Sequence, residues 1–124
     1  MNEGDVFRFL RIADIHVWMI ISDPARDSKN VLMVNFTSED PDVDQACLVL
    51  PGEHPFITCR TLIEYARARV TNDAAIEQLR AAGRLEMFEP LSAALLAKVR
   101  NCAMLSTTLK TDFADILEQQ ELVD

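Results

Sequence analysis

Apolar residues occur in short runs along the first part of the chain, and polar turn residues separate these runs. The Asp23-Pro24 and Pro51-Gly52 pairs end two of them, because proline cannot donate a backbone hydrogen bond to a sheet. A further turn is predicted at Ala13-Asp14. Strands are predicted over residues 6–10, 16–21, 31–36, 47–50 and 56–59. The two most apolar strands, 16–21 and 31–36, carry few polar side chains, and these lie at or near the strand ends.

Residues 61–70 give two conflicting local signals. Thr61 with Glu64 three residues later has the pattern of a helix capping box, which predicts a helical turn. The alternation of small apolar and cationic residues over Ala66–Val70 favours a half-exposed edge strand. A helix that continues through Ala66–Val70 is the alternative.

A helical period begins after residue 70. Ile76 and Leu79 share a face of a helix predicted over 73–82, and Gly83 follows at the position where helices end. A second helix is predicted from a stripe of apolar residues with Ser92 as its N-cap: Leu91, Leu95, Leu96, Val99, Cys102 and Ala103. Thr111 or Asp112 is expected to cap a last helix.

Strands followed by helices predict an α+β fold with an antiparallel sheet. Short strands joined by tight turns favour a small β-barrel over residues 1–70. The helices of residues 71–124 are then an extension packed on the barrel, within a single globular unit.

Composition narrows the class of protein. The chain of 124 residues has a formal net charge of −8, which disfavours non-specific binding to nucleic acid. The cysteines, Cys47, Cys59 and Cys102, are odd in number and form no CxxC pair, which indicates a reducing compartment. The acidic first residues lack a signal-peptide pattern, and no apolar run is long enough to span a membrane. A cytoplasmic protein without a membrane segment is expected.

Three segments resemble the MazF/PemK-like toxins of toxin–antitoxin pairs: Gly4-Asp5-Val6, Val17–Ser22 and Val31–Ser38. The resemblance covers roughly residues 4–70. It implies an SH3-like barrel, a homodimer, an antitoxin protein as partner, and cleavage of single-stranded RNA without a metal or cofactor.

The resemblance also implies roles for individual residues. The family has a strand that ends in Thr-Ser, which Thr37-Ser38 matches, and an arginine in the neighbourhood where this chain has His16. Thr37 is then expected to hold the phosphate, and His16 or His54 to serve as general acid or base, since histidine exchanges protons near neutral pH. The alternative is that His16 caps a strand and that His54 is held in a turn, each hydrogen-bonded to backbone.

Further residues are candidates for substrate binding. Trp18 is a candidate for stacking on a base, or else belongs to the core. The arginines Arg60, Arg67 and Arg69 are candidates for phosphate contacts together with Ser38, or else they keep an edge strand solvated. The two histidines and the cysteines lack the close ligand spacing of a zinc site, so no metal is expected.

The sequence therefore leaves two hypotheses. One is a toxin-like endoribonuclease of a toxin–antitoxin system, favoured by the Thr-Ser match. The other is a non-enzymatic module on the same fold that binds a protein partner, favoured by the charge of −8.

Overall fold

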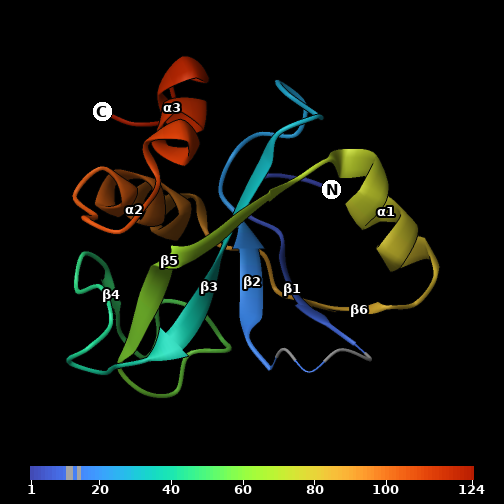
Figure 1. Cartoon of the computed structure of the whole chain (residues 1–124). Helices are drawn as coiled ribbons and strands as arrows, with labels where there is room; N and C mark the ends of the chain where they lie inside the picture. The colour runs from blue at the N-terminus through green and yellow to red at the C-terminus, as the bar shows by residue number, and fades with distance from the viewer. Residues whose placement is uncertain (11–12, 14) are drawn as a thin grey trace.

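The computed structural model describes residues 1–10, 13 and 15–124. In it the chain forms a small α+β fold with a curled, antiparallel, half-barrel sheet and three helices (Figure 1). The sheet has the order β4-β5-β3-β2-β1-β6. Its strands are β1 (Val6–Phe9), β2 (Val17–Ile20), β3 (Val31–Ser38), β4 (Leu48–Val49), β5 (Thr61–Thr71) and β6 (Leu85–Phe88). The helices are α1 (Asp73–Ala81), α2 (Ala93–Ala103) and α3 (Thr111–Gln119).

Both faces of the sheet are covered, which explains why β2 and β3 are apolar almost throughout. In Figure 1, α2 and α3 lie together on one side of the sheet and α1 lies on the other. The larger core lies with α2 and α3 and includes Val17, Met19, Val34, Tyr65, Leu95, Val99 and Leu117. The smaller core lies with α1 and consists of Phe7, Trp18, Ile20, Val31, Met33, Ile76 and Leu85. Successive residues of β2 thus enter different cores, as the two-residue period of a strand requires.

The helix boundaries follow local capping chemistry at two of the three N-termini. The Asn72 side chain accepts a hydrogen bond from the Ala75 amide and begins α1. The Ser92 side chain accepts one from the Leu95 amide and begins α2, as predicted. The prediction of a cap at Thr111 or Asp112 is wrong, because α3 already begins at Thr111 and its N-cap, Lys110, makes no side-chain capping bond.

Residues 61–71 form one continuous strand, β5. The predicted helical turn over Thr61–Glu64 is therefore wrong, and the edge-strand interpretation of Ala66–Val70 is confirmed. Pairing with β3 on one side and β4 on the other overrides the local capping-box signal. The register with β3 is irregular: Asn35 pairs with Glu64, whereas Met33, two residues away, pairs with Arg69. Extra residues of β5 are accommodated there as a bulge.

Two further segments differ from the predictions. Residues 56–59 form irregular structure that begins in a turn, rather than a strand. The strand β6 lies between α1 and α2, where only helices were expected, and pairs with β1. The all-strands-then-helices order is thus wrong at β6, because a four-residue strand that pairs with a distant segment has no local periodic signal. The turn predicted at Ala13-Asp14 includes residue 14, which lies outside the described residues.

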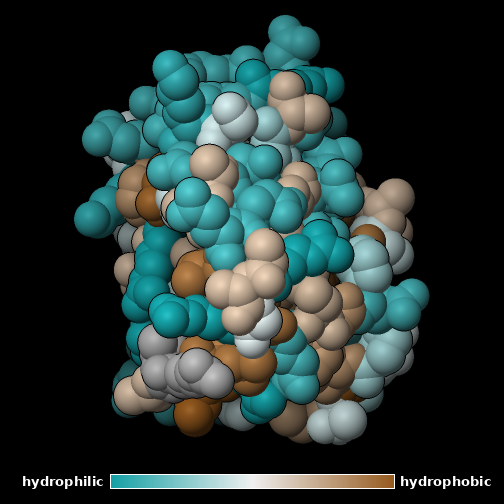
Figure 2. Space-filling view, turned by 90° about the vertical axis from the view of Figure 1, so that its right-hand side faces the viewer, coloured by the Kyte–Doolittle hydropathy of each residue, from teal (hydrophilic) through white to brown (hydrophobic). Residues whose placement is uncertain are grey.

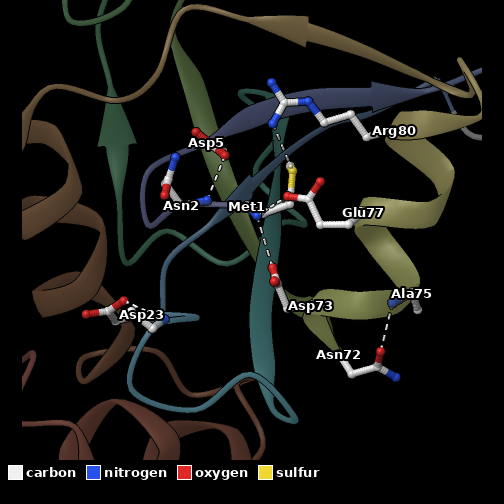
Figure 3. A network of polar contacts seen from close by, with 10 residues as sticks. Met1, Asn2, Asp5, Asp23, Asn72, Asp73, Ala75, Glu77 and Arg80 are labelled. Carbon is white, nitrogen blue, oxygen red and sulfur yellow. Dashed lines mark hydrogen bonds and ion pairs between the residues drawn. The ribbon is translucent and has the colours of Figure 1, made fainter.

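The first residue of the chain ties the sheet to α1 (Figure 3). The α-ammonium of Met1 bonds Asp73 Oδ1 at 3.1 Å and also bonds Glu77 Oε1. The Arg80 guanidinium reaches the Met1 sulfur at 3.8 Å. The hydrogen bond from Met1 lowers the pKa of Glu77. Burial opposes the charge on Met1, but the hydrogen bonds to Glu77 and Asp73 outweigh it and raise the pKa of the α-ammonium.

These opposite pKa shifts predict a window of pH in which the contact stabilises the fold. The lowered pKa of Glu77 adds stability above its ordinary value of 4.5, and the raised pKa of Met1 adds stability below its ordinary value of 8.0. Glu77→Gln should therefore lower the free energy of unfolding by about 0.5 kcal/mol at pH 6. The difference should shrink as the pH rises through the pKa of Met1. Urea unfolding at pH 6 and pH 10 measures it, and an equal difference at both would contradict the assignment.

Candidate functional site

One end of the sheet collects polar side chains around a pocket of about 360 Å³. There β2 begins, β3 ends and β5 begins, at the lower end of the molecule in Figure 1. We call it the His16 pocket. Its lining residues are Ile15, His16, Val17, Phe36, Thr37, Ser38, Phe56, Ile57, Thr58, Cys59 and Thr61. The pocket is thus assembled from three segments that are far apart in the sequence.

The antiparallel register explains why His16 and Thr37 meet. Trp18 pairs with Asn35 in the β2–β3 ladder. Two residues further toward this end of the sheet, His16 therefore lies across from Thr37. Both residues line the pocket, so the sequence-predicted pair is brought together.

A carboxylate holds the imidazole of His16. The His16 Nε2 lies 3.3 Å from Glu64 Oε1, and the two side chains are 22% and 16% exposed. The same Glu64 oxygen accepts a hydrogen bond of 2.7 Å from Asn35 Nδ2. Asn35 is fully buried and also donates to the Phe36 carbonyl at 3.1 Å. Glu64 is thereby fixed from β3, and it in turn orients His16 from β5.

This arrangement gives His16 the geometry of an acid–base group. A carboxylate beside one ring nitrogen orients the ring, and it favours the tautomer that carries a proton on that nitrogen. Histidine is a common general base and general acid in active sites.

Hydroxyl groups supply the remaining polar atoms of the pocket. Thr37 is half-buried and Ser38 is exposed, and within the described part of the chain no hydrogen bond occupies either hydroxyl. The Thr61 hydroxyl is occupied, since it donates to the Cys59 carbonyl at 2.9 Å. The lining residues that the structure describes include no lysine or arginine. The pocket therefore offers neutral donors beside one imidazole.

His54 lies apart from the His16 pocket and is 3% exposed. Its Nδ1 accepts a hydrogen bond of 3.0 Å from the Phe56 amide. Nε2 then carries the proton and donates to the Glu89 carbonyl at 2.5 Å. Both ring nitrogens are thus hydrogen-bonded to backbone. This agrees with the alternative that His54 is held in a turn rather than acting as an acid or base. A second hollow of about 330 Å³ lies beside His54, between Glu53 and Pro90.

Trp18 is fully buried in the smaller core. Its ring meets Phe9 edge-on with a centroid separation of 6.3 Å, and the Arg69 guanidinium lies 4.9 Å from the ring centroid. A base cannot stack on a ring with no exposed surface, so the core interpretation fits and the stacking interpretation does not.

The three candidate arginines do not form one patch in the pocket. Arg60 lies at its margin, between two lining residues, and pairs in a bidentate manner with Glu39 at 3.0 and 3.1 Å. This pairing lowers the pKa of Glu39. Arg67 and Arg69 are exposed on the later part of β5, beyond the lining residues.

Sequence reasoning missed Glu64, because the capping-box pattern assigned it to a helical turn. Reading residues 61–71 as a strand would have placed it across from Asn35, the one amide within an apolar strand. In the part of the chain that is described, no three side chains of the types that hold metals gather in one place. Burial raises the pKa of the Cys47 thiol, which keeps it protonated.

Comparison with models of known protein families gave no match to the chain. Comparison with curated proteins gave no match either. Of the helices that are described, none has the length and apolar character needed to cross a bilayer.

Proposed function

We propose that the His16 pocket is the active site of a metal-independent ribonuclease that cleaves single-stranded RNA. One observation carries the proposal: a histidine held by a carboxylate shares an open pocket with two available hydroxyls. Cleavage of RNA by its own 2′-hydroxyl needs a base, an acid and donors to the phosphate, but no metal. The side chains of this pocket include each kind of group.

In the proposed reaction, His16 takes the proton from a ribose 2′-hydroxyl. The 2′-oxygen attacks the adjacent phosphorus, and the bond from phosphorus to the 5′-oxygen breaks. His16 then returns the proton to the leaving 5′-oxygen, and a 2′,3′-cyclic phosphate remains on the other fragment. Glu64 holds the imidazole in position, while Thr37 and Ser38 donate to the phosphate oxygens. Because no lysine or arginine is among the described lining residues, binding should depend only weakly on salt concentration.

The resemblance to the MazF/PemK-like toxins supports the same proposal. The half-barrel sheet is compatible with an SH3-like barrel, and the Thr37-Ser38 pair at the end of β3 matches the family pattern. We therefore propose a cytoplasmic, toxin-like component whose partner is an antitoxin. A homodimer stays a prediction of this resemblance, and light scattering tests it.

The test of the proposed activity is cleavage of a long, unstructured RNA in the presence of EDTA. We expect fragments that end in a 2′,3′-cyclic phosphate, formed at the same rate with and without the chelator. A matched RNA with 2′-O-methyl groups throughout should remain intact, since it lacks the attacking hydroxyl. An intact natural RNA, or cleavage that EDTA abolishes, would refute the proposal.

A second candidate function is that of a protein-binding module. Apolar side chains are exposed beside the pocket: Ile15 is 84% exposed and Phe56 is 42% exposed. In Figure 2 brown, hydrophobic atoms are more frequent in the lower half, where they lie among hydrophilic ones, whereas the upper part is mostly hydrophilic. Together with the net charge of −8, this favours a protein over RNA as ligand. Absence of cleavage together with a protein that copurifies, and that Ile15→Asp releases, would support this candidate.

A further inference from the structure

The strand β5 is much longer than its outer neighbour. β4 pairs only with Thr61 and Leu62 of β5, whereas β5 continues to Thr71. On its inner side β5 pairs with β3 along most of its length. From Glu64 to Thr71, the outer side of β5 therefore has no partner strand among the described residues. In Figure 1 this part of β5 continues past β4.

The outer part of β5 is exposed and cationic. Ala66, Arg67 and Arg69 are exposed. No carboxylate of the described residues lies in ion-pair contact with either arginine, while Arg69 rests on the Trp18 ring. The whole chain carries −8, and five of the nine other arginine and lysine side chains that are described have acidic or backbone partners: Arg8, Arg26, Arg60, Lys98 and Arg100. A local excess of positive charge on an acidic protein thus coincides with an unpaired strand edge.

We propose that the outer edge of β5, from Glu64 to Thr71, binds an extended acidic segment of a partner protein as an added strand. The unpaired backbone groups would provide hydrogen bonds to the added strand, and the arginines would select carboxylate side chains. Ala66, being small, leaves room for an incoming side chain.

A second copy of this chain fits the edge less well than an acidic segment. Antiparallel pairing of two β5 edges sets the arginines of one copy beside those of the other, which is unfavourable. RNA also fits less well, because it cannot pair with a row of alternating amide and carbonyl groups. The edge shares only Glu64 with the residues that build the His16 site, and its arginines lie beyond the lining residues of the pocket, which end at Thr61. The inference therefore does not depend on RNA cleavage.

The test uses a fluorescein-labelled peptide of about ten residues that alternates glutamate and valine, an extended acidic strand. Fluorescence anisotropy should show saturable binding to the full chain. Two further peptides carry N-methyl groups on alternate residues, one set on odd and one set on even positions. One of them should fail to bind, because an added strand presents the amides of alternate residues to the edge.

Matched charge reversals identify the edge. Arg67→Glu should weaken binding of the peptide about tenfold. Arg84→Glu should leave it within about twofold, because Arg84 is also exposed but precedes β6 at the opposite edge of the sheet. Circular dichroism checks that both variants fold, and Arg67→Gln replaces Arg67→Glu if the latter does not.

Several outcomes would overturn the inference. These are no binding of the acidic peptide, equal binding of both N-methylated peptides, or equal weakening by Arg67→Glu and Arg84→Glu. Binding of an oligouridylate that falls with Arg67→Glu, when the peptide does not bind, would make the edge a phosphate contact instead.

Discussion

His16→Ala should lower the rate of RNA cleavage by about 10²–10⁴-fold, the usual contribution of a positioned acid–base group. The physical reason is the loss of the only imidazole that lines the pocket. Its side chain is 22% exposed and belongs to neither core, so the fold should persist. Single-turnover cleavage of a labelled RNA measures the rate, and circular dichroism confirms the fold.

The control for His16→Ala removes a polar side chain outside the pocket. Thr107→Val changes an exposed residue of the α2–α3 connection and should leave the cleavage rate unchanged. Equal rates for wild type and His16→Ala would remove His16 from the mechanism. Glu64→Gln should reduce the rate less than His16→Ala, because Glu64 positions the imidazole rather than touching the substrate.

Trp18→Ala should lower the free energy of unfolding by about 3–5 kcal/mol. The ring is fully buried between Phe9 and Arg69, and its removal leaves a cavity in the smaller core. A small domain has a total stability of only about 5–15 kcal/mol, so the variant should be close to unfolding. Chemical denaturation followed by circular dichroism measures the change. Tryptophan fluorescence cannot be used for this variant, because Trp18 is the one tryptophan of the chain.

Trp18→Met separates the core role from base stacking. Methionine fills part of the same space but has no ring to stack on a base, so the variant should fold with reduced stability and cleave RNA at the wild-type rate. A large loss of cleavage in a folded Trp18→Met would restore the stacking role and contradict the placement of Trp18 in the core.

The sequence predicts the centre of this fold because the apolar runs of β2 and β3 have no competing interpretation. Burial on both faces makes each run continuous, and polar turns bound it. The start of β5 was assigned wrongly because Thr61 and Glu64 match a local helical signal that pairing with β3 overrides. β6 was missed because its strand character depends on β1, a segment distant in the sequence.

As with the fold, only part of the candidate site could be predicted from the sequence. His16, Thr37 and Ser38 could be placed together, because they lie at the ends of two apolar strands that one polar turn joins. Glu64 could not, because its place in the site depends on β5 being a strand. His54 was a candidate only because histidine is a common acid–base residue. Its two ring nitrogens are occupied by hydrogen bonds to the backbone of Phe56 and Glu89, and no local sequence pattern reveals these bonds.

The central claim is that RNA occupies the pocket where β2, β3 and β5 meet and contacts His16 there. Nuclear magnetic resonance tests it with a short 2′-O-methyl RNA, which binds without being cleaved, added to isotope-labelled protein. We predict that the imidazole signals of His16 and the amide signals of Thr37 and Ser38 shift together, while those of His54 remain in place. RNA-dependent shifts that spare His16, or no shifts at saturating RNA, would contradict the account.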